Sequence, residues 1–181
     1  MPSALRPATL VEPGSAPCRA SVRTPLGRMD VAACDEGLVG AWFEGAAHLP
    51  DFRAWPAVRS HPLLDRAADE LAAYFAGALQ VFRTPRLALW GTDFQRRVWV
   101  ALESVPWGQR TTYGLLAAAV GSPQAVRAAG AAVGRNPWSI MVPCHRVVGA
   151  NGSLTGYAGG LARKRALLEA EGWLAGAGSG R

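Results

Sequence analysis

Residues 111–134 of this chain read TTYGLLAAAVGSPQAVRAAGAAVG. The apolar spacing predicts a helix over residues 111–120, then a tight turn, then a second helix over residues 123–133 with Ser122 as its N-cap. Pro123 would occupy the first helical position, where a missing backbone N–H is tolerated. Two short helices joined in this way form a helix-turn-helix pattern, which predicts a mainly helical domain for this part of the chain.

The second of these helices carries few polar side chains. Within its sequence, AVRAAGAAVG, only Arg127 has a side chain able to bond a base edge. The small residues Ala128 and Ala131 would instead allow close backbone approach, which suits the narrow minor groove of double-stranded DNA with Arg127 as the one long probe. An Ala-rich helix buried in the core explains the same segment equally well.

The charge of the chain is distributed unevenly. The formal net charge is +6, and all of it arises after Trp90, because the preceding residues carry equal numbers of acids and bases. No acidic residue lies between Glu103 and Glu169, whereas that stretch holds seven basic residues. One-sided charge of this kind favours a polyanionic partner, and a solvated basic face is the equally supported alternative.

Upstream of the helical half, the pattern changes to short β-prone runs. Residues 21–24, 29–33 and 38–43 are separated by turn residues and predict an antiparallel meander. Apolar residues at helical spacing over residues 63–79 predict a helix that covers it. Thr92-x-x-Gln95 then has the form of a capping box that begins the helical part.

We therefore predict an α+β chain, with a small antiparallel sheet and a helix followed by a mostly helical domain that contains the helix-turn-helix. The expected divisions are a loosely ordered arm (1–19), the α+β domain (20–84), a linker (85–91), the helical domain (92–173) and a flexible tail (174–181).

Length and cysteine content limit the class of protein. The 181 residues are enough for a hydrophobic core, and no apolar run reaches the roughly 18 residues of a membrane span. Three cysteines, Cys18, Cys34 and Cys144, cannot all pair, and the N-terminus lacks the pattern of a secretory signal. We expect a soluble cytoplasmic protein without a disulfide framework and without a membrane partner.

Residues 140–147, IMVPCHRV, bring three reactive side chains together. A β-prone run and a proline precede Cys144, His145 and Arg146. A thiolate is a strong nucleophile, and neighbouring histidine or arginine raises its population at neutral pH. Side chains of adjacent residues in an extended segment point to opposite faces, so a Cys144–His145 link requires a turn or an intervening water. A Cys-His pair alone is weak evidence, and a buried inert cysteine is the simpler interpretation.

Two further features follow this motif. The loop Gly156-Tyr157-Ala158-Gly159-Gly160 has an aromatic centre on which a planar ligand could rest. A helix over residues 161–171 ends at Gly172, and Glu171 at its end could orient a histidine. A solvated glutamate at a helix end is the simpler alternative.

Taken together, these residues resemble the O6-alkylguanine-DNA alkyltransferases, also called methylated-DNA–protein-cysteine methyltransferases. Pro143-Cys144-His145-Arg146-Val147 carries the resemblance. It is supported by Phe94-Gln95, Thr112-Tyr113-Gly114, Arg135-Asn136-Pro137, Tyr157-Ala158-Gly159-Gly160 and Glu171-Gly172. The similarity covers about residues 20–173 and implies a ribonuclease-H-like first domain and a winged-helix-like second domain.

The resemblance implies a role for each matching position. Cys144 would accept the alkyl group from O6-alkylguanine, and less efficiently from O4-alkylthymine, in a single irreversible transfer. His145 would take the thiol proton through a water, Glu171 would orient His145, and Asn136 would brace the turn. Tyr113, Val147, Tyr157 and Ala158 would form the pocket for a flipped base, and Arg127, Ala128, Ala131 and Tyr113 would contact DNA.

Two departures from the family pattern affect its predicted site. Some relatives carry serine at the position of Ala158, so a hydroxyl contact is lost here. Some relatives hold zinc with two cysteines and two histidines, but Val39 stands where one histidine would be expected, so we predict no metal and no cofactor. We expect a monomer, and whether copies bind DNA cooperatively is left open.

Two other classes of function compete with alkyl transfer. A non-catalytic relative that binds alkylated guanine and flags it for repair would lack the cysteine, so Cys144 argues against it. A Cys-His hydrolase would need an oxyanion hole and a small-molecule cleft in place of a helix-turn-helix with a basic face.

Overall fold

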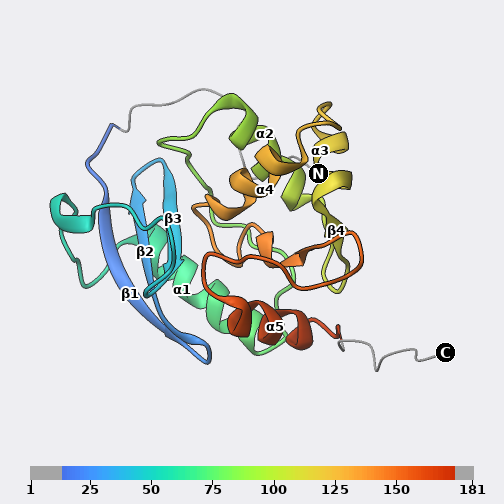
Figure 1. Cartoon of the computed structure of the whole chain (residues 1–181). Helices are drawn as coiled ribbons and strands as arrows, with labels where there is room; N and C mark the ends of the chain where they lie inside the picture. The colour runs from blue at the N-terminus through green and yellow to red at the C-terminus, as the bar shows by residue number, and fades with distance from the viewer. Residues whose placement is uncertain (1–13, 174–181) are drawn as a thin grey trace.

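A computed structural model describes residues 14–173 of the chain (Figure 1). Its first part is an antiparallel sheet in the order β1 (Cys18–Thr24), β2 (Gly27–Cys34) and β3 (Gly37–Phe43). The predicted meander is confirmed, with β1 beginning at Cys18, inside the expected arm. Residues 1–13 of that arm and the expected tail, 174–181, lie outside the described residues.

Helix α1 (Pro62–Phe75) covers one face of the sheet and contacts all three strands (Figure 1). The predicted helix is present but ends four residues early. Its buried positions are Leu64, Ala67, Leu71 and Tyr74. Tyr74 is therefore buried, whereas the neighbouring Phe75 is only partly buried against the same core. The other face of the sheet packs against an aromatic cluster of Trp42, Phe52, Trp55 and Trp90, with Phe52 in the short helix η1 (Phe52–Ala54).

Strand β3 has two additional segments bonded to its outer edge. The Leu38 N–H donates to Pro85 O, and the Leu87 N–H donates to Leu38 O. Further along, the Ala41 N–H donates to Pro137 O, and Ala41 O accepts from the Ser139 N–H. The expected linker, 85–91, is therefore not free, because its first residues pair with the sheet.

The helical part consists of α2 (Asp93–Glu103), α3 (Tyr113–Ala119), α4 (Val126–Gly134) and α5 (Leu161–Ala170). The predicted capping box of α2 is confirmed, because Thr92 and Gln95 bond reciprocally. Two short strands, β4 (Thr111–Thr112) and β5 (Val147–Val148), pair in parallel.

The helix-turn-helix is formed by α3 and α4, but the second helix starts later than predicted. Its first residue is Val126, and the N-cap Ala125 has no side-chain hydrogen bond. The prediction that Ser122 caps the helix and Pro123 begins it is wrong, because Ser122 O accepts the Ala125 N–H at 2.8 Å and closes a separate turn.

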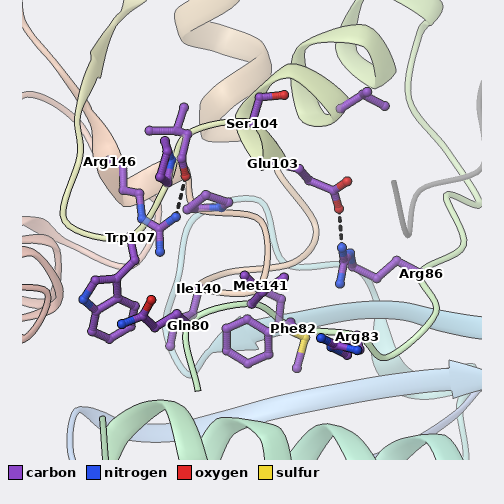
Figure 2. Close-up of a pocket in the computed structure, with 15 residues that line it drawn as sticks. Gln80, Phe82, Arg83, Arg86, Glu103, Ser104, Trp107, Ile140, Met141 and Arg146 are labelled. Atoms are coloured by element: carbon purple, nitrogen blue, oxygen red, sulfur yellow. Dashed lines mark hydrogen bonds and ion pairs between the residues drawn. The ribbon is translucent and has the colours of Figure 1, made fainter. Parts of the chain in front are cut away.

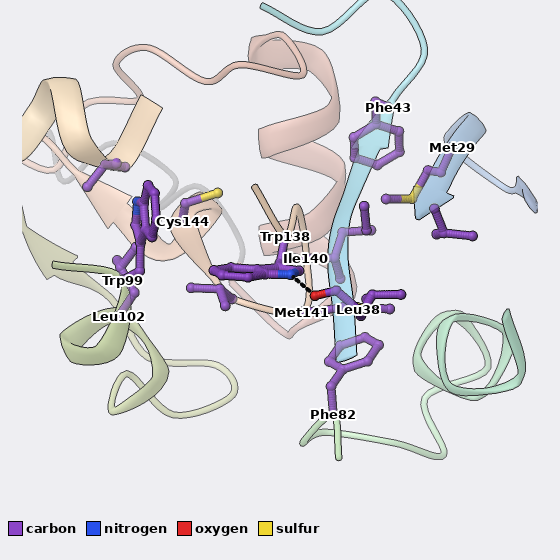
Figure 3. Close-up of a cluster of buried hydrophobic side chains, with 14 of the residues drawn as sticks. Met29, Leu38, Phe43, Phe82, Trp99, Leu102, Trp138, Ile140, Met141 and Cys144 are labelled. Atoms are coloured by element: carbon purple, nitrogen blue, oxygen red, sulfur yellow. Dashed lines mark hydrogen bonds between the residues drawn. The ribbon is translucent and has the colours of Figure 1, made fainter. Parts of the chain in front are cut away.

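One hydrophobic core joins the sheet to the helical part (Figure 3). Trp138 is fully buried between β3 and α2. Its Nε1 donates to Leu38 O at 2.8 Å, and its ring meets the ring of Trp99 edge-on at 5.8 Å. Because the segment before Cys144 is fixed to the sheet in this way, the first domain determines where the cysteine lies.

Candidate functional site

Cys144 lies in a buried turn rather than at the end of a strand. The β-prone run over residues 140–142 does not form a strand, because Ile140 has a left-handed φ of 71° and the chain turns into the short helix η2 (Cys144–Arg146). Asn136 braces this turn: its Nδ2 donates to Val142 O at 2.9 Å and lies 3.0 Å from Cys144 Sγ. The turn that a Cys144–His145 link requires is therefore present.

The surroundings of the thiol influence its ionisation in opposite directions. Burial raises the pKa of Cys144, whereas the hydrogen bond from Asn136 and the positive charge of Lys164 lower it. In the resting protein burial prevails, so the thiol keeps its proton until a base removes it.

His145 is the nearest candidate base along the chain and is completely buried. Its Nε2 lies 2.9 Å from Glu171 Oε1, and its Nδ1 has no hydrogen-bond partner among residues 14–173. Burial lowers the pKa of His145, and the hydrogen bond to Glu171 offsets only part of that effect. Because an ionised carboxylate only accepts hydrogen bonds, Nε2 carries the proton and Nδ1 keeps a free lone pair. His145 is thus held as a neutral base.

Glu171 is not a solvated helix-end glutamate. Its carboxylate accepts hydrogen bonds from Arg146 Nε at 2.7 Å and Arg146 Nη2 at 2.8 Å, and from the hydroxyl of Tyr74 at 2.8 Å. Burial alone would raise the pKa of Glu171, but the hydrogen bonds from His145 and Arg146 and the positive charge of Arg146 outweigh it and lower the pKa to about 2. The carboxylate therefore stays ionised at any ordinary pH.

Lys164 supports the loop that follows the cysteine motif. Its side chain is buried, and Nζ donates to Thr155 O at 2.6 Å and Gly156 O at 3.2 Å. Burial lowers the pKa of Lys164 to about 8, although negative charge on Cys144 acts in the opposite direction. Lys164 thus fixes the loop and brings positive charge toward the thiol.

A cavity of about 510 Å³ lies between α4 and this loop. Tyr113, Arg127, Tyr157 and Ala158 line it, so the structure brings together four of the predicted contact residues. Val147 is fully buried in β5 and does not line the cavity. Burial raises the pKa of Tyr157, and negative charge on Cys144 adds to the shift. Tyr157 is thus a lining residue of the cavity whose ionisation is affected by the charge of Cys144.

The outward face of α4 carries the residues of this helix that were predicted to contact DNA. Arg127, Ala128 and Ala131 are exposed, while Ala129, Ala132 and Val133 are buried. The alternative of an Ala-rich helix buried in the core therefore holds for one face only. The opposite face of α4 exposes small side chains and one arginine to solvent.

A larger cavity of about 610 Å³ lies elsewhere, between residues 80–86, the end of α2 and the cysteine turn (Figure 2). Phe82, Trp107, Ile140 and Met141 give it an apolar lining, and Arg86 pairs with Glu103 at one end. It shares no lining residue with the smaller cavity. Arg146 lines this cavity, and its Nη1 donates to Val105 O at 2.6 Å. Because the same side chain pairs with Glu171, the larger cavity adjoins the site on the side of Arg146.

Within residues 14–173 the structure has neither a metal-binding cluster nor a membrane-spanning helix. No three His, Cys, Asp or Glu side chains there are grouped closely enough to hold a metal ion. None of the helices in the same range has the length and apolar character needed to cross a membrane.

Both halves of the chain match models of one protein family. Residues 19–88 match the 6-O-methylguanine DNA methyltransferase ribonuclease-like domain, and residues 93–173 match the DNA binding domain of the same family. A methylated-DNA–protein-cysteine methyltransferase of Mycolicibacterium paratuberculosis is 43% identical over 83% of this chain and 90% of its own length. One of Salmonella typhimurium is 60% identical over 59% of this chain, and the match covers 63% of the Salmonella protein.

Solved structures show the same fold. The crystal structure of Mycobacterium tuberculosis OGT in complex with DNA is 42% identical, with a TM-score of 0.81 over 85% of this chain and 92% of that one. A crystal structure of the O6-methylguanine methyltransferase from the same organism gives a TM-score of 0.79 at 42% identity, over 86% of this chain and 93% of that one.

The fold and the site together define a class of two-domain proteins. In this class a small α+β domain packs on a helix-turn-helix domain that contains a buried cysteine next to an ion-paired histidine. Within that class, the chain belongs to the 6-O-methylguanine DNA methyltransferase family.

Sequence patterns alone did not identify two members of the site. Tyr74 reaches Glu171 from a helix 97 residues earlier, and Lys164 lies in a helix whose periodicity says little about which face is buried. The signal for Tyr74 was its helical spacing from Ala67 and Leu71, which predicts that the three share a face. The signal for Lys164 was its status as the only lysine of the chain.

Proposed function

We propose that this protein repairs DNA by transferring an alkyl group from O6-alkylguanine, and less efficiently from O4-alkylthymine, to its own Cys144. The observation that carries the proposal is a buried Cys144 thiol held by Asn136 and followed by His145, which pairs with Glu171. A cavity at α4 contains Tyr157, whose ionisation is affected by Cys144. The names of the relatives and the DNA complex of OGT support the same reaction.

In the proposed reaction, the Cys144 proton passes through a water to Nδ1 of His145. The thiolate attacks the alkyl carbon, an S–C bond forms, and the C–O bond breaks with its electron pair going to the guanine oxygen. The proton then returns from His145 to the purine, so guanine is restored. Glu171 and its partners stabilise the transient imidazolium. The thioether product cannot be reduced by cellular thiols, so each chain acts once.

The substrate would be double-stranded DNA bound through its minor groove to the exposed face of α4. A guanine O6 inside the duplex faces its partner base, so the nucleotide has to rotate out to meet the thiol. Tyr113, Tyr157 and Ala158 would hold the flipped base in the 510 Å³ cavity, and Arg127 would fill the vacated space in the stack. The reaction as proposed needs one protein copy and no cofactor.

Intact-mass measurement tests the reaction itself. Incubation with duplex DNA containing O6-methylguanine should add one methyl group per chain, and peptide mapping should place it on Cys144. A methyl group on Cys18 or Cys34, or turnover beyond one equivalent, would show that the proposal is wrong.

Changing Arg127 to alanine should slow repair of duplex DNA far more than reaction with free O6-methylguanine base. Filling the stack matters only in a duplex, and unstacking a base costs a few kcal/mol, which corresponds to a loss of about a hundredfold. Single-turnover rates on both substrates measure the difference. Arg23→Ala, which removes an exposed arginine of β1 that lines neither cavity, is the matched control. Equal losses on both substrates would instead assign Arg127 to the fold or the pocket.

A further inference from the structure

The first domain contributes a wall to the cavity at α4. Ala47 and His48, in the segment after β3, are the only residues from before α2 among its described lining residues. The Ala47 N–H donates to Ala158 O at 2.9 Å, which ties this segment to the loop that also lines the cavity. The cavity is therefore enclosed by both domains.

A second connection holds the same wall in place. Arg163 in α5 donates from Nε to Leu26 O at 3.0 Å and from Nη1 to Gly159 O at 3.0 Å and Glu44 O at 3.4 Å. Its guanidinium also lies 4.6 Å from the centre of the Phe43 ring. Leu26, Phe43 and Glu44 belong to the first domain, and Gly159 belongs to the loop at the cavity. These contacts of Arg163 fix the segment that carries His48 relative to the loop that lines the cavity.

His48 has an unusual backbone conformation. Its φ is 63°, and in the described chain the only other residue besides glycine with a positive φ is Ile140, in the cysteine turn. Side chains disfavour this left-handed region, and such conformations are concentrated at functional sites. A glycine would relieve the strain, yet this position carries a histidine, and that histidine lines the cavity.

His48 is an exposed residue of the cavity lining, on the side from which the backbone of a bound nucleotide would approach. His48 is exposed, whereas Tyr157, in the same cavity, interacts with the deeply buried Cys144, so the reactive end is the inner one. Arg127 also lines the cavity, and none of its described lining residues is acidic. A base placed toward Cys144 leaves its sugar and phosphates at the outer end, and an imidazole N–H can donate to a phosphate oxygen.

We propose that His48 binds the sugar-phosphate backbone of the extruded nucleotide, so that the first domain forms one side of the nucleotide site. This inference rests on the proposed alkyl transfer and adds a substrate contact to it. His48 is assigned to substrate binding, with no role in moving the thiol proton.

Single-turnover rates at subsaturating protein test the contact. His48→Ala should slow repair of O6-methylguanine in duplex DNA about tenfold, the expected effect of one lost hydrogen bond to a charged group, and leave the rate with free O6-methylguanine base unchanged. Leu49→Ala is the matched control, because Leu49 is exposed on the same segment but does not line the cavity. Equal loss on both substrates, or no loss on the duplex, would overturn the assignment.

Two further measurements test whether the variant folds and whether the group that His48 contacts is a phosphate. His48→Asn keeps a polar side chain that tolerates positive φ, so it should fold like the parent and keep part of the duplex rate. An uncharged methylphosphonate at a phosphate flanking the lesion should slow the parent protein and cause no further loss in His48→Ala. Independent, additive losses would show that His48 does not contact that phosphate. If the parent itself fails to methylate Cys144, the proposed function is wrong.

Discussion

Replacing Cys144 by serine should abolish alkyl transfer without abolishing binding to alkylated DNA. A serine hydroxyl has nearly the shape of the thiol and can still accept the hydrogen bond from Asn136. A hydroxyl, however, is a far weaker nucleophile toward an alkyl carbon than a thiolate, and its higher pKa leaves almost none of it ionised beside a neutral histidine. We expect no methyl addition by intact mass after a time in which the parent reacts completely, which is a loss of about a thousandfold or more.

The matched control is Cys18→Ser, because Cys18 is a partly buried thiol in β1 outside the site. This variant should accept one methyl group at the parent rate. Methylation of the Cys144→Ser chain, or loss of activity in Cys18→Ser, would contradict the assignment of the acceptor. Fluorescence anisotropy with labelled DNA checks that binding survives in both variants.

Glu171→Gln should slow the transfer step about a hundredfold, within the range expected when general base catalysis is impaired. The amide can still bond His145 but no longer balances the positive charge that His145 gains with the proton. It also removes the carboxylate that Arg146 faces in the interior. Breaking a buried ion pair from one side destabilises a protein by about 3–5 kcal/mol, so rates should be measured well below the melting temperature of the variant.

The pH dependence of this variant distinguishes a chemical role from a structural one. In the parent, the Glu171 carboxylate raises the pKa of His145 against the effect of burial. Its removal lowers that pKa, so His145 becomes neutral at lower pH and the acid limb of the rate profile should move to lower pH. The maximum rate should fall, because the base is weaker. Superimposable profiles would show that Glu171 has only a structural role.

Tyr74→Phe serves as the control for Glu171. It removes one hydrogen bond to the same carboxylate oxygen but keeps the charge and the buried ring. The rate should fall much less than in Glu171→Gln, and the acid limb should remain near its parent position. An equal loss would mean that the hydroxyl of Tyr74, more than the charge of Glu171, orients His145.

The parts of the fold that local patterns encode were predictable from the sequence. The strands alternate with turn residues, Thr92 and Gln95 form their capping box within one turn, and the two helices at Gly121 follow from apolar spacing. The start of the second helix was not predictable in this way. Ser122 and Pro123 suit a helix start, yet the turn they form competes for the same backbone groups.

The candidate site depends on contacts that no local pattern reports. Cys144 and His145 were recognisable from their motif, and Asn136 and Glu171 from the resemblance. Their geometry, however, requires the left-handed Ile140 and the buried partner Tyr74. Because burial decides whether Glu171 is solvated or ion-paired, only the three-dimensional structure separates these two interpretations.

The pairing of the β3 edge with the segment before Cys144 has a consequence for synthesis of the chain on the ribosome. Trp138 lies 100 residues after Leu38, whose carbonyl it binds. Synthesis proceeds at roughly 5–20 residues per second, so the edge of β3 stays unpaired at this point for about 5–20 s until its partner has been made. An unpaired edge can add a strand from another chain, so this interval is the period of greatest exposure to aggregation. Residues 85–87 emerge earlier and bond Leu38 from the same side, which shortens the time for which that end of the nascent sheet is open.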